Sequence, residues 1–275
     1  MVDLSNATFI IPLRIESADR MRNIITLLCF LFGNFDTNVI VKEVDSEPVF
    51  EENVLPQVRE FIGRDINLTH VFEKSDDSVF YRMHILNEML AMSKTDVVIN
   101  YDCDVLMPVP TYTIAYNSIL NGTCDVVYPY GHGNFQKQVH VTDEIVTDFL
   151  NSDFDFSIMD DKSNISSSDF GWVQFFNRQV YLEGGMENEN FRGSSPEDKE
   201  RYFRFTNLGY KVGRLDNWIY HLEHSRGDNS WPNSVRGNPY MAQNFEVWNQ
   251  IQKMNKEQLV EYYSNQEYLK KYASV

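Results

Sequence analysis

The strongest constraint on the fold is the alternation of short β-branched runs with helical patterns over the first hundred residues. Each run has the length of one strand, and each helical pattern is long enough to cross back over a sheet. A repeated strand–helix order of this kind predicts an α/β fold with a mainly parallel central sheet and helices on both faces. The expected strands are residues 8–15, 38–44, 66–74 and 95–102, and the expected helices are 17–33, 51–62 and 78–93.

The second half is less regular. Residues 131–169 are polar, and within them the stretch 152–170 is rich in Ser and Asp with little periodicity, which predicts a mobile loop. The other expected elements are a helix near 110–121, strands at 124–130 and 170–177, and a helix near 196–208.

The length of 275 residues suits one large α/β domain. The stretch from residue 240 onward is helical in pattern and carries aromatic anchors. We therefore expect a domain over 1–235, made of a half at 1–107 and a half at 108–235, with a helical extension at 236–275 packed on it.

Charge and cysteine content narrow the function. A net charge of -16 argues against a nucleic acid polymer as partner, because such binding depends on Lys and Arg neutralising phosphates. The cysteines Cys29, Cys103 and Cys124 are odd in number and far apart, which indicates free thiols in a reducing compartment. We expect no signal peptide and no transmembrane segment, since the longest apolar run, at 24–32, has the pattern of a buried helix face.

The last expected strand of the first half ends in "YDCDVLMP", with Asp102 and Asp104 one residue apart. In a parallel sheet this position is the carboxyl edge, where ligands bind. Positions i and i+2 of a strand share a face, so both carboxylates can converge on one hard cation that also holds a diphosphate. The alternative is a solvated turn at the end of the strand.

A second acidic pair, Glu197 and Asp198, stands in "RGSSPEDKERYF". Ser195 as N-cap and Pro196 at the first helical position explain much of this stretch as a helix start, with Asp198 completing something close to a capping box. A carboxylate at such a helix N-terminus can also serve as a general base toward a sugar hydroxyl. The spacing alone does not decide between these roles.

Two further stretches carry chemistry-bearing side chains. In "WIYHLEHSRGD", His221 and His224 are three residues apart in an expected loop and can supply nitrogen ligands to a metal, although lone histidines are more often structural. In "VFYRMHILNEML", Phe80 and Arg82 can stack on a base and pair with a phosphate. The alternative for the latter is an amphipathic helix.

Taken in order, these segments resemble the β-1,4-galactosyltransferase family of inverting glycosyltransferases with the GT-A (Rossmann-like) fold. "IIPLRIESADR" resembles the I-P-F-R-x-R opening of the family, "FYRMHILNEML" its F-N-R-A-x-L-L-N segment, and "YDCDVLMP" its D-V-D-L-x-P. "RGSSPEDKERYFRFTNLGYKV" resembles the family segment W-G-W-G-x-E-D-D-D-x-x-x-R-L, and "HLEHSRGD" resembles M-I-R-H-S-R-D. The resemblance spans residues 8 to 230.

The resemblance implies a role for each matching position. It implies a Mn²⁺ cofactor, with Mg²⁺ as an alternative, a UDP-sugar donor and a glycan acceptor. Asp104, His221 and His224 would ligate the metal, Asp198 would be the catalytic base, and Glu197 would bind the acceptor. The nucleotide-sugar would be held by Pro12, Arg14, Phe80, Arg82, Asp102 and Cys103, to which Asp45 is added from its position after the second strand, a place that it shares with Glu43.

The implied reaction is an inverting, metal-dependent transfer of a Gal, GalNAc or Glc-type hexose in polysaccharide or glycoprotein glycan synthesis. The chain departs from the family in having "RGSSP" where a tryptophan-containing loop stands, and Glu16 where the opening motif has a second basic residue. With no membrane anchor expected, we predict a cytoplasmic enzyme, bacterial or viral, that can lie peripheral to a membrane. A sugar-phosphate nucleotidylyltransferase and a non-catalytic sugar- or nucleotide-binding module remain as alternatives.

Overall fold

A computed structural model describes residues 1–167, 169–225 and 238–273 of the chain. The main sheet orders its strands β10-β6-β9-β4-β1-β2-β3, and the second sheet orders them β5-β11-β7-β8. In the main sheet the strands are β1 (Val2–Leu13), β2 (Phe35–Asp45), β3 (Leu68–Lys74), β4 (Val97–Tyr101), β6 (Val126–Tyr128), β9 (Val173–Asn177) and β10 (Val212–Arg214). The second sheet contains β5 (Val105–Leu106), β7 (Gln136–Val139), β8 (Ser163–Ser166) and β11 (Ile219–Leu222).

The main sheet is mixed but mainly parallel, as predicted. β1 pairs in parallel with β2 and β4, β2 with β3, and β6 with β10, whereas β9 runs antiparallel between β4 and β6. Every strand predicted in the first half is present, and β1 extends the predicted strand toward the N-terminus by several residues.

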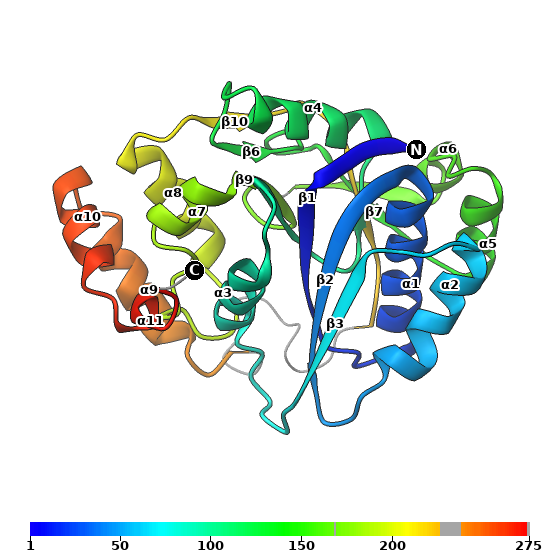
Figure 1. The fold of residues 1–275 in the computed structure, drawn as a ribbon, viewed down its shortest axis with the longest axis horizontal. Helices are drawn as coiled ribbons and strands as arrows, with labels where there is room; N and C mark the ends of the chain where they lie inside the picture. Colours follow the sequence, from blue (N-terminus) through cyan, green and yellow to red (C-terminus); the bar gives the residue numbers. More distant parts are fainter. Residues whose placement is uncertain (168, 226–237, 274–275) are drawn as a thin grey trace.

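Helices cover both faces of the main sheet (Figure 1). Those that precede β6 are α1 (Ala18–Asn34), the π-helical turn η1 (Phe50–Val54) continued by α2 (Leu55–Ile62), α3 (Arg82–Met92) and α4 (Val109–Leu120). α1 and α2 lie on one side of β1, β2 and β3, and α3 lies on the other. Ser17 caps α1 as predicted, since its hydroxyl accepts the Arg20 backbone N–H at 3.2 Å.

The remaining helices follow β6 in the sequence. They are α5 (Asp143–Asn151), α6 (Ser157–Asp160), α7 (Arg178–Glu183), α8 (Glu197–Leu208), α9 (Met241–Ile251), α10 (Lys256–Ser264) and α11 (Glu267–Lys270). α9 and α10 pack against α8, on the outer side of the molecule. The predicted boundary after residue 235 lies outside the described residues. Among the helices that are described, none is long and apolar enough to cross a membrane.

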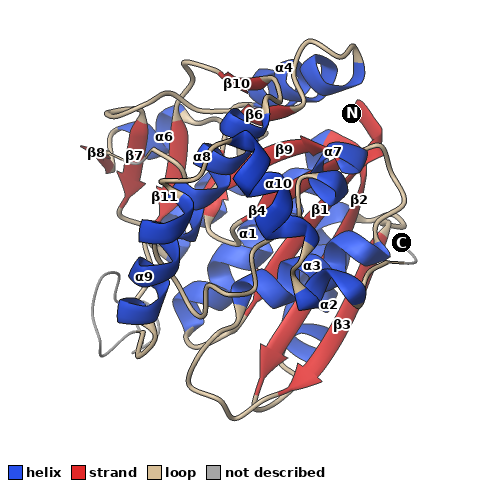
Figure 2. Ribbon diagram, turned by 90° about the vertical axis from the view of Figure 1, so that its left-hand side faces the viewer, coloured by secondary structure: helices blue, strands red, loops and turns tan. Residues whose placement is uncertain are grey.

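The polar stretch 131–169 differs from its prediction. We expected a mobile loop over 152–170, but the structure places α6 and β8 within it, and β8 pairs with β7 in the second sheet (Figure 2). β8 is half-exposed and polar, and so it lacks the apolar alternation by which strands are recognised. Its formation depends on the neighbouring strand.

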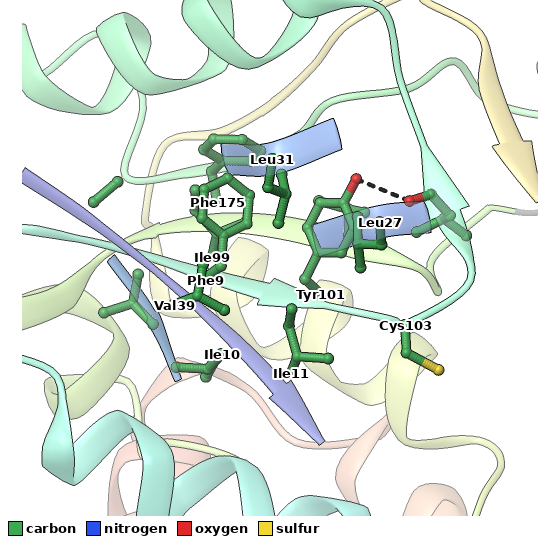
Figure 3. Close-up of a cluster of buried hydrophobic side chains, with 14 of the residues drawn as sticks. Phe9, Ile10, Ile11, Leu27, Leu31, Val39, Ile99, Tyr101, Cys103 and Phe175 are labelled. Carbon is green, nitrogen blue, oxygen red and sulfur yellow. Dashed lines mark hydrogen bonds between the residues drawn. The ribbon is translucent and has the colours of Figure 1, made fainter. Parts of the chain in front are cut away.

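A continuous apolar core lies between the sheet and the helices. Phe9, Ile99 and Phe175 come from three adjacent strands and pack in one cluster with Leu27 and Leu31 of α1 (Figure 3). The three cysteines are unpaired, as expected. In Figure 3, Cys103 lies beyond the end of β4, at the edge of this cluster, where the polar site begins.

Candidate active site

A cavity of about 270 Å³ lies at the carboxyl ends of β1 and β4. Its lining comes from segments far apart in the sequence: the end of β1, the first turn of α1, the β4–β5 turn, the start of α8 and the end of β11. The lining residues are Pro12, Arg20, Phe80, Arg82, Asp102, Cys103, Asp104, Trp172, Ser194, Glu197, Asp198, His221 and His224. Most of the predicted site residues are therefore brought together in one place.

The turn between β4 and β5 directs its two aspartates to different partners. β4 ends at Tyr101, so Asp102 and Asp104 lie in a turn, where the strand rule of alternating faces does not apply. The Asp102 carboxylate forms an ion pair with Arg82 at 2.5 Å, and the Asp102 backbone N–H bonds to the Trp172 carbonyl at 3.0 Å. Burial raises the pKa of Asp102, although Arg82 opposes that shift.

Asp104 faces a pair of histidines. The distance from Asp104 Oδ2 is 3.2 Å to His224 Nε2 and 3.7 Å to His221 Nε2. Arg20 Nη1 lies 3.3 Å from the same oxygen. Burial disfavours the ionised carboxylate, but the interactions with His221, His224 and Arg20 outweigh it and hold the pKa of Asp104 well below its usual range.

One of the two histidines lies in a strand, whereas a loop was predicted for both. His221 is in β11 of the second sheet, and His224 lies in the loop after the end of that strand, as predicted. The Leu222 backbone N–H donates to the Asp104 carbonyl at 2.8 Å, and Asn23 of α1 donates to the Leu222 carbonyl at 3.0 Å. Asp19 accepts the Ser225 N–H at 2.9 Å. These bonds fix the histidine segment against α1 and the aspartate turn.

Hydrogen bonds to the Nδ1 atoms orient both imidazoles. His224 Nδ1 lies 2.8 Å from the Ser225 carbonyl, which can only accept, so this nitrogen carries the hydrogen. His221 Nδ1 lies 2.7 Å from Gln138 Oε1. With a metal ion bound beside Asp104, the Nε2 lone pairs of both rings would face it, which is the arrangement that metal-binding histidines use.

These three residues fit a divalent cation. Their ligand atoms all lie within 4.8 Å of one another, and buried Asp104 Oδ1 has no hydrogen-bond partner among the described residues. Two imidazole nitrogens and a carboxylate oxygen suit a borderline ion such as Mn²⁺ better than Mg²⁺, which prefers an all-oxygen shell.

At the opposite side of the lining, α8 begins with Glu197 and Asp198. The Glu197 side chain is buried, and its Oε2 has no partner among the described residues. Burial and the adjacent charge of Asp198 raise the pKa of Glu197 to about 8. Asp198 is about one-third exposed, and its Oδ1 lies 2.7 Å from Arg201 Nη1 and 3.8 Å from Arg82 Nη1.

The start of α8 lies one residue later than predicted. Pro196, and not Ser195, is the N-cap residue, the first helical residue is Glu197 and not Pro196, and no side chain forms a cap bond. An N-cap needs an extended backbone, whereas Ser195 has a φ of 63°. The Ser195 carbonyl accepts a hydrogen bond from Asn244 of α9 at 2.9 Å. The contact with α9 thus holds the segment that leads into α8.

A buried ion pair between Arg201 and Glu187 supports the acidic pair of Glu197 and Asp198. Arg201 is fully buried and contacts both carboxylate oxygens of Glu187, at 2.6 Å and 2.7 Å. Tyr181 donates a further hydrogen bond to Glu187. Arg201 is thereby held in place with one nitrogen left for Asp198.

Two predicted residues do not line the cavity. Arg14 donates to the backbone carbonyls of Val44 at 2.9 Å and Asp77 at 3.0 Å, and its guanidinium lies over the Phe80 ring. Asp45 accepts the Ile15 N–H at 3.0 Å. Arg14 and Asp45 thus connect the loop after β1 with the loop after β2. Glu43, the alternative to Asp45, is fully buried and accepts backbone N–H bonds from Val49 and Phe50.

Three contributors were not predicted from the sequence. Arg20 lies one helical turn after Glu16, which stands where the opening motif of the resembled family has a second basic residue. This spacing is the only local sign that Arg20 supplies the positive charge in its place. Gln138 lies in β7 and Trp172 directly precedes β9, and no motif marks either residue. Pairing between distant strands brings both next to His221.

A larger cavity, of about 650 Å³, shares His221 and His224 with the first. Asp19, Arg22, His140 and Glu223 are among its other lining residues. It contains none of Asp102, Glu197 and Asp198, so we assign the candidate chemistry to the smaller cavity.

The sheet order, the flanking helices and the position of the cavity define the GT-A fold of glycosyltransferases. One solved structure with this fold is the mannosyltransferase PcManGT from Pyrobaculum calidifontis in complex with GDP-Man and Mn²⁺. It superposes with a TM-score of 0.56 at 16% identity, over 96% of this chain and 69% of that chain. GalNAc-T7 with UDP, GalNAc and Mn²⁺ gives a TM-score of 0.54 at 10% identity, over 89% of this chain and 49% of that chain.

At these identities the likeness establishes the fold alone. The chain spans about half to two thirds of the length of these two structures. No protein-family model and no curated protein matches the sequence. The predicted α/β GT-A fold is thus confirmed, whereas the specific resemblance to β-1,4-galactosyltransferases is not.

Proposed function

We propose that the chain is a metal-dependent glycosyltransferase that moves a hexose from a UDP-sugar to a hydroxyl of a glycan acceptor. The observation that carries this proposal is the pairing, in one cavity, of the Asp104–His221–His224 group with the acidic pair Glu197 and Asp198. A nucleotide-sugar needs a cationic environment for its diphosphate, and an acceptor hydroxyl needs a base.

The donor would bind along the β1, α3 and β4 side of the cavity. Pro12 and Phe80 offer apolar surface to a base, and Arg82 and Arg20 offer cations to the phosphates. A Mn²⁺ ion held by Asp104, His221 and His224 would neutralise charge on the departing diphosphate. Asp102, oriented by Arg82, would accept a hydrogen bond from the ribose or the donor sugar.

The acceptor would bind at the start of α8. Both ion pairs of Asp198 use Oδ1, which leaves Oδ2 to remove the proton from the attacking hydroxyl. Attack from the face opposite the diphosphate inverts the anomeric centre. Glu197, protonated at neutral pH by its raised pKa, would donate a hydrogen bond to the acceptor.

The biological setting follows only from the proposed reaction. Such an enzyme would act in polysaccharide or glycoprotein glycan synthesis with a donor of the Gal, GalNAc or Glc type. The expected cytoplasmic location stays a prediction.

The test is a donor screen with the purified full chain. UDP-Gal, UDP-GalNAc, UDP-Glc, UDP-GlcNAc and GDP-Man are each incubated with and without Mn²⁺, and release of the nucleoside diphosphate is measured. We expect Mn²⁺-dependent release from one UDP-sugar, lost in Asp104→Asn and kept in the matched surface variant Asp148→Asn.

Other outcomes would contradict the proposal. Tight Mn²⁺-dependent binding without release or transfer to any tested acceptor would indicate a binding module. Formation of a nucleotide-sugar from a sugar phosphate and UTP would indicate a nucleotidylyltransferase.

A further inference from the structure

Trp172, the residue directly before β9, has a backbone conformation that its side chain does not favour. Its φ is 67°, in the left-handed region that bulky residues rarely adopt. The surrounding chain holds this conformation in place, because the Trp172 carbonyl accepts the Asp102 N–H at 3.0 Å and the Gly171 carbonyl accepts from Tyr130 and Gln174. Strain that is fixed from several sides is typical of ligand-binding positions.

This conformation places the indole against the candidate metal group, which consists of Asp104, His221 and His224. The Trp172 ring lies 4.3 Å from the His221 ring, centroid to centroid, and Trp172 lines the same cavity as Asp102, Asp104 and Asp198. Trp172 packs at the margin of the apolar core, so one part of the ring is supported while another borders the cavity.

The indole N–H is the observation that points to a bound ligand. Trp172 Nε1 is shielded from solvent and has no hydrogen-bond partner among the described residues. Buried indole N–H groups usually find an acceptor, because leaving the group unpaired in a desolvated environment is unfavourable. A molecule in the adjoining cavity can provide the missing acceptor.

The properties of this position suit a sugar better than a phosphate. Arg20, Arg82 and a cation held by the candidate metal group would already supply positive charge for a diphosphate, whereas the indole is neutral. An aromatic face packs well against the C–H surface of a hexose, and its N–H can donate to a hydroxyl oxygen. Trp172 also supplies an indole where the "RGSSP" segment has none.

We infer that Trp172 binds the transferred hexose of the nucleotide-sugar and helps to determine which sugar is accepted. This inference rests on the proposed glycosyltransferase function. The role is one of binding and specificity, since Trp172 has no group that can exchange a proton with the acceptor.

Trp172→Phe removes the N–H and keeps an aromatic ring against His221. With Mn²⁺ present, we expect the affinity for the UDP-sugar selected by the donor screen to fall 3- to 20-fold in this variant. The affinity for UDP and for Mn²⁺ alone should stay within twofold of the wild type. Trp218→Phe is the matched control, because Trp218 packs on Phe135 outside the cavity.

A second measurement reads the wild-type protein directly. The chain has four tryptophans, and the ¹⁵N-indole signal of Trp172 can be assigned by its absence in Trp172→Phe. Mn²⁺ is paramagnetic and would broaden a signal this close to His221, so diamagnetic Mg²⁺ takes its place in this measurement. In the wild type the signal should shift when the UDP-sugar is added to protein with Mg²⁺ and shift much less with UDP.

The outcomes separate this inference from the proposed function. If UDP with Mn²⁺ does not bind the wild type at all, the proposed function fails. If UDP binds but the Trp172 signal responds equally to UDP and to the UDP-sugar, the assignment to the hexose is wrong. If Trp172→Phe weakens UDP, Mn²⁺ and UDP-sugar binding equally, Trp172 only supports His221.

Discussion

At the scale of single residues, neighbouring carboxylates in the cavity have different environments and therefore different roles. Asp198 is about one-third exposed and held by Arg201, while Glu197 next to it is buried without a hydrogen-bond partner on Oε2 in the described part of the chain. Asp102 and Asp104 differ in the same way, one paired with Arg82 and the other facing two histidines. Sequence spacing alone treats the members of each pair as equivalent.

Asp198→Asn tests the base. Asparagine keeps the shape of the side chain but cannot take up a proton, so transfer should fall by about 10²- to 10⁴-fold. Arg201 keeps its bidentate pair with Glu187, and we therefore expect the fold and the affinity for UDP with Mn²⁺ to change little. Transfer rates and calorimetric titration measure the two effects, and full activity in this variant would refute the assignment.

Glu197→Gln tests the raised pKa. Folding lifts the pKa of Glu197 from 4.5 to about 8, so its contribution to stability is complete below pH 4.5 and is lost as the pH rises through 8. Glutamine does not titrate. Between pH 5 and pH 8 the free energy of unfolding of the wild type should therefore fall by about 1–3 kcal/mol more than that of the variant. Urea unfolding at both pH values measures this, and parallel pH profiles would contradict it.

At the scale of elements, α8 joins the candidate site to the C-terminal helices. Its first turn carries Glu197 and Asp198, and its buried face carries Arg204, which pairs with Glu200 at 2.9 Å and lies 4.5 Å from the Tyr263 ring centroid of α10. Tyr263 also donates a hydrogen bond to Glu200. The position of the acidic pair therefore depends on contacts that α8 makes outside the sheet.

Arg204→Met should destabilise the chain by about 3–5 kcal/mol, because it leaves the buried Glu200 carboxylate without its cation. Adding Glu200→Gln to this variant removes the uncompensated charge and should recover part of the loss. Lys199→Ala, at an exposed position of the same helix, is the control and should change the free energy of unfolding by less than about 0.5 kcal/mol. Chemical denaturation measures all three, and a cost below about 1 kcal/mol for Arg204→Met would show that the pair is not needed.

At the scale of the whole molecule, the Asp104–His221–His224 group lies where the chain passes from the main sheet into the second sheet. Asp104 is in the turn between β4 of the main sheet and β5 of the second sheet, and His221 lies in β11 of the second sheet. An ion held by these residues would link segments more than a hundred positions apart. Binding to the folded chain alone would then stabilise the entire fold.

We expect Mn²⁺ at a hundred times its Kd to add about 2.7 kcal/mol to the free energy of unfolding. His224→Ala should remove most of this gain, since it deletes one nitrogen ligand beside Asp104. His132→Ala, at an exposed histidine, should respond like the wild type. Thermal unfolding at constant ionic strength measures the effect; an equal gain in His224→Ala would mean that Mn²⁺ binds elsewhere.

The sequence by itself determined the layered α/β plan, the start of α1 at the Ser17 cap, and the position of Asp102 and Asp104 at the carboxyl end of β4. These features depend on side-chain periodicity, capping groups and turns, each of which involves only a few neighbouring residues. Five short segments in a fixed order were enough to identify most of the residues that line the cavity.

Only the tertiary structure decided the second sheet and the partners within the site. β7, β8 and β11 are short and include polar positions, so their apolar pattern is weak and their pairing depends on hydrogen bonds between distant segments. The pairing of β7 with β11 brings Gln138 to His221, the pairing of β9 with β4 in the main sheet brings Trp172 there, and packing of α1 brings Arg20 to Asp104. Contacts of this kind depend on how the whole chain folds back on itself, and no local pattern of residues specifies them.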